Sequence, residues 1–236
     1  MGKPGSKGRV LIVVTGHEQF GDLERRTGYW LSEVTHFYEL LHRAGYELDI
    51  VSPNGGRPPV DEKSAGVMDR WKNRAVLKDP EYIQKMGNTL RPDQVDPKDY
   101  RAIYYAGGHG VMWDVPENTA MANLASKIFE NGGVVSAVCH GPCGILNVKL
   151  SNGKYLVDGR KVTGFANVEE GLLRLTPHVP YLLEEELKKR GGTYKRSLPF
   201  VPYAVADGRL VTGQNPFSSK AVARRVIKVL EEQAPA

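Results

Sequence analysis

The chain has few cysteines and no long hydrophobic segment. Two cysteines in 236 residues are too few for a disulfide scaffold or a cysteine zinc site, so any role for cysteine should come from its reactivity. The longest apolar run near the N-terminus, Val10 to Val14, is far shorter than a membrane span or the core of a signal peptide. We therefore predict a cytoplasmic, soluble protein with no membrane partner.

A strong excess of one charge is also missing. The chain has 32 basic and 27 acidic residues, a net charge of +5, and its basic residues are scattered as short pairs such as Arg25-Arg26. No recognised nucleic-acid module accompanies them, which favours a solvated surface and no nucleic-acid partner. The hydrophobic fraction of 41% is ordinary for a globular chain, and a chain of this length can bury a full core.

Strand and helix patterns alternate along the chain. The β-branched run at Val10–Val14 is typical of a strand buried on both faces of a parallel sheet. We predict further strands at 47–52, 102–106 and 134–138, and helices at 28–43, 116–133, 181–190 and 218–232. The alternation predicts an α/β fold with a mostly parallel sheet.

Two hairpin signals and one long insertion interrupt this alternation. Leu156–Thr163 and Val205–Thr212 each place Asp-Gly between short apolar runs, which predicts two β-hairpins added to the sheet. The segment 56–98 is too long for a structureless loop. We expect it to form short helices that cover one end of the sheet, either as a lid or as a plain surface insertion, within a single domain spanning 1–236.

The predicted strand at 134–138 is followed at once by Cys139 and His140. Ala137-x-Cys139-x-Gly141 has the small residues of a nucleophile elbow, a strained strand-to-helix turn in which bulky neighbours would clash. The turn would hold the sulfur above the N-terminus of the next helix, which favours thiolate. The alternative is a buried structural cysteine. We expect Cys143 to be a packing residue, with a Cys139–Cys143 disulfide as the other option.

A glycine-rich loop, Ala106 to Gly110, directly follows the strand at 102–106. In a parallel sheet this loop emerges at the same end as the elbow. Glycines at Gly107 and Gly108 would let backbone N–H groups approach a developing oxyanion or a substrate. The other interpretation is an ordinary turn.

One carboxylate lies on the apolar face of the predicted helix at 28–43. At about 100° per residue, Glu33 falls in the same sector as Trp30 and Phe37. A buried carboxylate is costly unless paired or protonated. Protonated, it could donate to a thiolate; ionised, it could accept a proton from substrate. The alternative is a glutamate at the helix edge that reaches solvent or a backbone group.

These features together resemble the ThiJ/PfpI superfamily, and within it the heat-shock chaperone/glyoxalase III branch, from Arg9 to Leu230. The segments that carry the resemblance are Thr27–Glu33, Pro59–Ser64, Gly107–Gly110, Ala137–Pro142 and Arg209–Pro216. The resemblance implies a flavodoxin-like doubly wound sheet and a homodimer. It also implies Cys139 as nucleophile, His140 as its base, Glu33 beside the thiol, and an acid that orients His140, either Glu169 or Glu170, of which we prefer Glu170.

The function that this resemblance implies is conversion of methylglyoxal and related 2-oxoaldehydes to 2-hydroxy acids, with deglycase activity as a possible extension. No cofactor is expected. Some relatives bind a metal through histidines and a carboxylate, but the scattered His17, His36, His42, His109 and His178 suggest no such site, so we predict no metal. The alternatives are a stress-response holding chaperone or cysteine redox sensor, and an intracellular cysteine peptidase.

Overall fold

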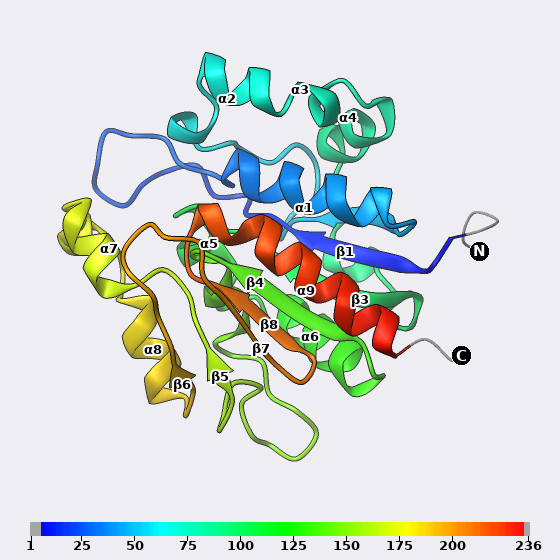
Figure 1. Ribbon diagram of the computed structural model, residues 1–236. Coiled ribbons are helices and arrows are strands. Elements are labelled where there is room, and N and C mark those ends of the chain that lie inside the picture. Colours follow the sequence, from blue (N-terminus) through cyan, green and yellow to red (C-terminus); the bar gives the residue numbers. More distant parts are fainter. Residues whose placement is uncertain (1–5, 234–236) are drawn as a thin grey trace.

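A six-stranded sheet forms the centre of the computed structural model, which describes residues 6–233 (Figure 1). The strand order is β2-β1-β3-β4-β8-β7, and every neighbouring pair is parallel except β7 and β8. The order of the parallel strands is that of flavodoxin-like doubly wound sheets. The predicted fold class is therefore confirmed. The strands are β1 (Arg9–Val13), β2 (Glu47–Val51), β3 (Tyr100–Tyr105), β4 (Val134–Val138), β7 (Ala204–Asp207) and β8 (Leu210–Gly213).

Helices cover both faces of this sheet. Helices α1 (Leu31–Arg43) and α9 (Ser219–Glu232) lie side by side over one face, and α6 (Thr119–Glu130) packs against β3 and β4 from the other (Figure 1). Asn118 caps α6, because its side chain accepts the N–H of Met121 at 3.0 Å. Within residues 6–233, no helix is both long and apolar enough to cross a membrane.

Smaller elements surround the carboxyl ends of the strands. They are α5 (Val111–Asp114), the 3₁₀ helix η4 (Gly141–Ile145), α7 (Asn167–Leu172), η5 (Thr176–His178), α8 (Leu183–Lys189) and η6 (Pro216–Ser218). A separate two-stranded parallel sheet joins β5 (Lys161–Val162) to β6 (Thr193–Tyr194).

Only one of the two predicted hairpins exists. β7 and β8 form it around Gly208, but β8 is itself a parallel partner of β4 inside the main sheet. The hairpin predicted at 156–163 is wrong. Its backbone closes turns instead: the N–H of Asp158 donates to Tyr155, and that of Arg160 donates to Val157. These local bonds leave only Lys161–Val162 extended, and that pair joins β6.

The insertion at 56–98 forms short helices, as expected. They are η1 (Glu62–Ser64), α2 (Val67–Lys72), α3 (Arg74–Leu77), α4 (Pro80–Gly87), η2 (Pro92–Gln94) and η3 (Pro97–Asp99). In Figure 1 the cyan helices α2 to α4 lie above α1. Asn73 accepts the hydroxyl of Thr35 on α1 at 2.5 Å, and the ring of Tyr82 packs edge-on to Tyr38 at 5.1 Å. The insertion therefore covers α1 and the β2 edge of the sheet.

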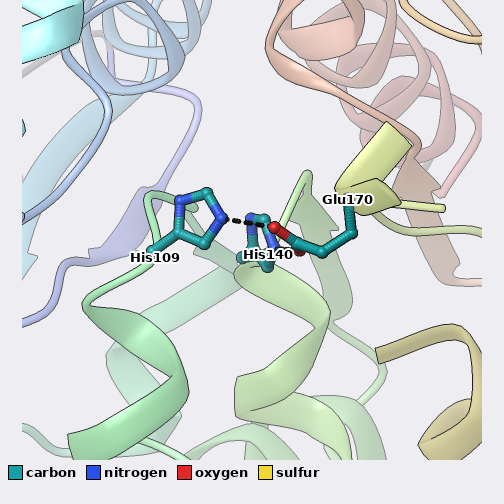
Figure 2. A group of neighbouring side chains, drawn as sticks. All are labelled: His109, His140 and Glu170. Carbon is teal, nitrogen blue, oxygen red and sulfur yellow. Dashed lines mark hydrogen bonds and ion pairs between the residues drawn. The ribbon is translucent and has the colours of Figure 1, made fainter. Parts of the chain in front are cut away.

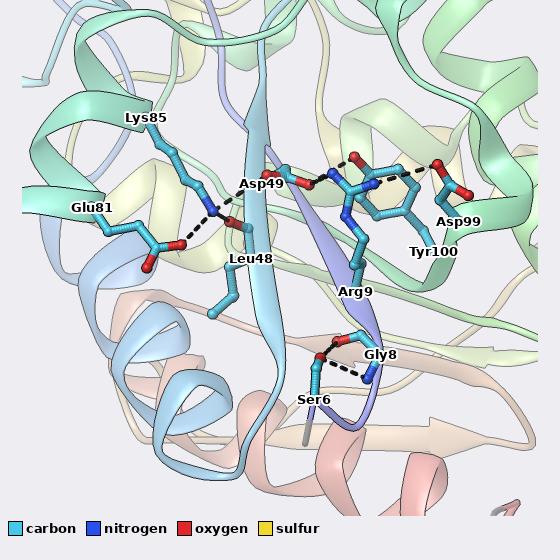
Figure 3. A network of polar contacts seen from close by, with 9 residues as sticks. All are labelled: Ser6, Gly8, Arg9, Leu48, Asp49, Glu81, Lys85, Asp99 and Tyr100. Atoms are coloured by element: carbon cyan, nitrogen blue, oxygen red, sulfur yellow. Dashed lines mark hydrogen bonds and ion pairs between the residues drawn. The ribbon is translucent and has the colours of Figure 1, made fainter. Parts of the chain in front are cut away.

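A polar cluster, the Asp49 network, joins this insertion to the amino ends of β1 and β3 (Figure 3). Asp49 on β2 contacts Arg9 at 2.5 Å, Lys85 of α4 at 3.3 Å and the hydroxyl of Tyr100 at 2.9 Å. Arg9 also reaches Asp99 at 3.3 Å. Opposite charges and a hydroxyl donor, supplied by two strands and one helix, thus satisfy the carboxylate.

Candidate active site

The predicted nucleophile elbow is present at the end of β4. Cys139 has φ +59°, a conformation that costs a residue with a side chain about 1–3 kcal/mol. Its N–H donates to Gly213 at 3.0 Å and its carbonyl accepts from Phe165 at 2.8 Å, which hold the turn. A Cβ at Gly141 would lie 2.1 Å from the carbonyl oxygen of Tyr105, so that position requires glycine.

The helix that follows the elbow is too short to supply the strong dipole that we predicted beneath the sulfur. Gly141–Ile145 is a five-residue 3₁₀ helix, so the favourable helix dipole predicted beneath the sulfur is weak at best. Cys139 itself is buried, with 3% of its surface exposed. Burial raises the pKa of its thiol well above the usual value, and Glu33 and Glu169 raise it further, whereas the backbone N–H of His140 opposes them. The resting sulfur therefore needs a base.

The histidine that we expect to act as this base lies next to the sulfur. His140 Nδ1 is 3.5 Å from Cys139 Sγ, and His140 Nε2 is 2.8 Å from Glu170 Oε2. Burial alone would raise the pKa of Glu170, but the attraction of His140 and the hydrogen bonds of both His109 and His140 lower it well below its usual range. The ionised carboxylate of Glu170 accepts a hydrogen bond from the Nε2–H group of His140. The proton of His140 is then on Nε2, and the lone pair of Nδ1 faces the thiol.

A second histidine shares Glu170. His109 Nε2 donates to Glu170 Oε1 at 2.9 Å, and the His109 and His140 ring centroids are 4.1 Å apart (Figure 2). Burial, followed by the neighbouring His140, lowers the pKa of His109 to about 4, so its ring is neutral near pH 7. We did not predict this contact, which joins residues 61 positions apart in the chain. The only local signal was the place of His109 after a strand.

His109, His140 and Glu170 are also the group best arranged to hold a metal ion, since one ligand atom from each lies within 4.8 Å of the others. The expectation that the histidines do not assemble with a carboxylate is wrong for His109. The donor atoms nevertheless satisfy one another, because each Nε2–H donates to a separate carboxylate oxygen. A metal would have to displace both protons, and no step below requires one.

The choice between the two adjacent acids follows from their partners. Glu169 points away from His140 and accepts the N–H groups of Ala166 at 3.0 Å and Phe200 at 2.7 Å, and the side-chain amide of Asn215 at 2.9 Å. Successive helical residues point about 100° apart, so only one of the pair can face His140. Glu170 contacts the histidine, and Glu169 holds three loop segments together.

The helix position of Glu33 left two interpretations open, and the structure shows a fully buried side chain that also satisfies a backbone group. Its Oε2 accepts the N–H of Gly107 at 2.5 Å, and its Oε1 has no hydrogen-bond partner within the described chain. Burial raises the pKa of Glu33 to about 8, with Gly107 and Cys139 opposing the shift. At neutral pH Glu33 therefore carries a proton beside the thiol.

The bond to Glu33 changes the role expected for the glycine loop. Because the Gly107 amide is committed to Glu33, it is not free to bind an oxyanion or a substrate. Gly108 lines the cavity, with φ +102° and no room for a Cβ, which would lie 2.1 Å from the carbonyl of Gly28. Of the two predicted glycines, only Gly108 faces the space above Cys139.

A cavity of about 530 Å³ opens above these groups. Its walls come from five parts of the chain: the start of α1, helix α2, the loop after β3, the elbow with the segments after it, and the start of α9. The lining residues beyond those already described include Trp30, Ser32, His36, Asp69, Lys72, Asn73, Phe165, Leu173, Phe200, Pro216, Phe217 and Lys220. The insertion thus contributes one wall through α2.

Cys143 lies outside this cavity. It is fully buried in η4, and burial raises the pKa of its thiol to about 12. Both cysteines are free thiols in the structure, so no Cys139–Cys143 disulfide is present. These observations agree with a packing residue.

The site combines a cysteine on a strained elbow, an adjacent histidine and a buried glutamate. All three are carried by a flavodoxin-like sheet, and this combination allows the class of protein to be identified. The model of the DJ-1/PfpI family matches residues 26–229, and the chain belongs to that family. Its homologues include glutathione-independent glyoxalases, which align over nearly the whole chain.

Two relatives and two solved structures illustrate this similarity. Glyoxalase 3 of Candida albicans is 30% identical over 94% of this chain and 98% of its own, and the glutathione-independent glyoxalase HSP31 of Saccharomyces cerevisiae is 32% identical with the same coverage. The Francisella tularensis Rapid Encystment Protein superposes with a TM-score of 0.90 at 37% identity, over 94% of this chain and 99% of its own. The Candida albicans glyoxalase III structure gives 0.88 at 29% identity, over 94% and 97%.

Proposed function

We propose that this protein converts 2-oxoaldehydes such as methylglyoxal to 2-hydroxy acids without glutathione. The observation that carries the proposal is the Cys139–His140–Glu170 chain of contacts, with a buried and protonatable Glu33 that also interacts with Cys139. Its relatives named as glutathione-independent glyoxalases support the same reaction.

The first step forms a hemithioacetal. The Cys139 thiol proton passes to His140 Nδ1 as Sγ bonds to the aldehyde carbon, and the aldehyde oxygen then takes that proton. Glu170 keeps the Nε2–H of His140 in place throughout, so that Nδ1 remains the atom that exchanges protons. The backbone amides of Gly108 and His140 are the donors we assign to the transient oxyanion.

The second step moves hydrogen between the two carbons. His140 Nδ1 removes the proton on the former aldehyde carbon while Glu33 donates its proton to the ketone oxygen, which gives an enediol. The imidazolium then protonates the neighbouring carbon, and Glu33 recovers a proton from the hydroxyl beside sulfur. The product is a thioester, and both side chains have returned to their starting protonation states.

Water then hydrolyses the thioester, releasing the hydroxy acid and restoring the thiol. The overall change adds one water to the oxoaldehyde and needs no external oxidant or reductant. The mechanism needs a carboxyl group that holds a proton at neutral pH, and the raised pKa of Glu33 supplies one.

The test is lactate formation from methylglyoxal in the absence of glutathione. We expect the wild-type protein and Cys143→Ala to form lactate at similar rates, and Cys139→Ala to form none above background. Cys143 is the matched control because it is equally buried but lies outside the cavity. Absence of lactate from the wild type, or equal activity of Cys139→Ala, would refute the proposal.

The same proteins separate the other candidate functions. Cleavage of fluorogenic peptides that is lost in Cys139→Ala would indicate a peptidase. Suppression of aggregation that survives Cys139→Ala would indicate a chaperone role independent of the thiol.

A further inference from the structure

The cavity above Cys139 is much larger than methylglyoxal. Its volume of about 530 Å³ falls within the roughly 300–1,000 Å³ of pockets that hold drug-sized ligands. If each heavy atom of methylglyoxal needs about the 30 Å³ that a liquid water occupies, the molecule fills on the order of 150 Å³. Most of the cavity therefore surrounds whatever is attached to the ketone carbon of the substrate.

Aromatic side chains line the cavity from His140 outward. The Phe165 ring lies 4.5 Å from the His140 ring, and the Phe200 ring lies 6.4 Å from Phe165. Phe217, with 61% of its surface exposed, lines the same cavity. An apolar group on the substrate would cover these rings, and aromatic rings pack on one another in tilted or offset arrangements like those seen here.

Phe200 holds its place in this wall at a conformational cost. Its φ of +59° is unfavourable for a bulky residue, and its N–H is fixed by Glu169 Oε1 at 2.7 Å. Glu169 is fully buried and also ties Ala166 and Asn215 to the same point. The fold thus uses a buried carboxylate to keep an aromatic ring at the cavity.

Two cations lie on the outer part of the cavity. Lys72 comes from α2 and Lys220 from α9, and neither forms an ion pair with any residue between 6 and 233. Asp69 is an acidic residue of the same lining, so the three side chains together carry one net positive charge. Burial, helped by Lys220, lowers the pKa of His36 to about 4, so that this fourth group is uncharged at neutral pH.

We infer that the preferred substrates are 2-oxoaldehydes whose ketone carbon carries an aryl group, with an anionic substituent such as a carboxylate at its far end. The inference rests on the proposed function: the oxoaldehyde reacts at Cys139 as above, the aryl group packs on Phe200 and Phe217, and the anion meets Lys72 and Lys220. The bonds made and broken are those of methylglyoxal conversion.

The experiment compares methylglyoxal, phenylglyoxal and 4-carboxyphenylglyoxal as substrates without glutathione. Because even one methylene in a pocket changes specificity by about 10-fold or more, we expect kcat/KM for phenylglyoxal to exceed that for methylglyoxal by at least that factor. The carboxylate should add roughly 2- to 5-fold at low salt and little at 1 M salt.

Variants separate pocket recognition from the intrinsic reactivity of the three aldehydes. Phe217→Ala should lower the aryl-to-methyl ratio of kcat/KM by about 10-fold. Phe200→Gly should lower this ratio by a similar factor, and glycine is chosen because it tolerates the positive φ at this position. Lys72→Gln and Lys220→Gln should lower only the carboxyl-to-phenyl ratio. Leu198→Ala is the control, because Leu198 is 71% exposed and does not line the cavity.

The outcomes distinguish this inference from the proposed function. Two results would overturn the substrate class and leave the glyoxalase proposal standing. One is turnover of methylglyoxal with no higher kcat/KM for the aryl substrates. The other is that the four variants leave the aryl-to-methyl and carboxyl-to-phenyl ratios of kcat/KM unchanged. A wild-type protein that converts none of the three aldehydes would overturn both.

Discussion

Two carboxylates in this protein, those of Asp49 and Glu170, each bind several polar partners, and the two sets of partners differ in chemistry. Asp49, with 14% of its side chain exposed, binds Arg9, Lys85 and Tyr100 near the amino ends of the strands. Glu170, with 5% exposed, binds His109 and His140 beside the elbow. The partners of Asp49 are permanent cations and a hydroxyl, which stabilise a fixed arrangement. The partners of Glu170 are imidazoles, and the ring of His140 lies where it can take up and return a proton during the proposed reaction.

The two sites also differ in what they leave unsatisfied. Around Asp49 both carboxylate oxygens have charged partners. Around Cys139 the structure retains a strained backbone, a carboxyl oxygen of Glu33 with no hydrogen-bond partner among residues 6–233, and a thiol whose pKa is raised by burial. Unfavourable features of this kind persist at functional sites when the surrounding fold imposes them. The contrast supports our proposal that the reaction takes place around Cys139, at the carboxyl end of the sheet. It also suggests that the Asp49 network, at the other end, serves to stabilise the fold.

The largest expected effect is on activity in Glu170→Gln. A glutamine side chain has one acceptor oxygen and one donor NH2 group, so it cannot accept hydrogen bonds from the Nε2–H groups of both His109 and His140, and the tautomer of His140 that leaves Nδ1 free would no longer be fixed. We expect kcat for methylglyoxal to fall by about 10²–10⁴-fold with the fold intact. Lactate assays and circular dichroism measure the two properties. Asp49→Asn is the matched control, and an equal loss of activity there would contradict the distinction between the two sites.

An intermediate effect is expected on the pH dependence of stability in Glu33→Gln. The folded-state pKa of about 8 exceeds that of an unfolded glutamate near 4.5, so the folded state binds the extra proton between these values. The wild type should therefore lose stability as pH rises through this window, by up to about 1.4 kcal/mol per unit. Gln keeps the acceptor for Gly107 but cannot ionise, so the variant should gain in free energy of unfolding relative to wild type from pH 5 to 8.

Denaturant unfolding at several pH values measures this difference. A constant offset between wild type and Glu33→Gln from pH 5 to 8 would contradict the buried, protonated glutamate. The same variant should lower the pKa of the Cys139 thiol, since it removes a neighbouring acid that raises it, and the pH dependence of iodoacetamide alkylation reports that shift.

The smallest expected effect is that of Asp49→Asn. It removes one charge from a partly exposed network, so we expect a loss of about 1–3 kcal/mol in the free energy of unfolding and no change in lactate formation beyond about twofold. Chemical denaturation and the methylglyoxal assay check the two statements. A large loss of activity would show that the two ends of the sheet are coupled.

Local patterns in the sequence predicted the scaffold of the site well. The strand at 134–138 matches β4 residue for residue, and the helix pattern placed Glu33 in the apolar sector, although it did not decide whether the side chain reaches solvent. Both depend on neighbours within a few positions, and periodicity records such neighbours. The elbow was visible for the same reason, because its steric demands fall on residues two positions from Cys139.

Contacts between distant segments could not be predicted in this way. Nothing in the loop at 106–110 indicates that His109 meets Glu170, and nothing near Glu169 indicates that it fixes the backbone of Phe200. The segment 156–163 has the composition of a hairpin, but turns formed with Tyr155 and Val157 replaced it. These outcomes depend on how the whole chain packs.

The position of β8 has a consequence for the growing polypeptide. β4, whose residues are all buried, pairs with β8 along one edge, and β8 begins at Leu210, 72 residues after β4 ends at Val138. Until Leu210–Gly213 has been synthesised, the elbow strand presents an open apolar edge, the kind of surface on which nascent chains aggregate. Cys139 would also lack the Gly213 carbonyl that receives its N–H. The turn at Cys139 is thus completed only after a segment far downstream of it has been synthesised.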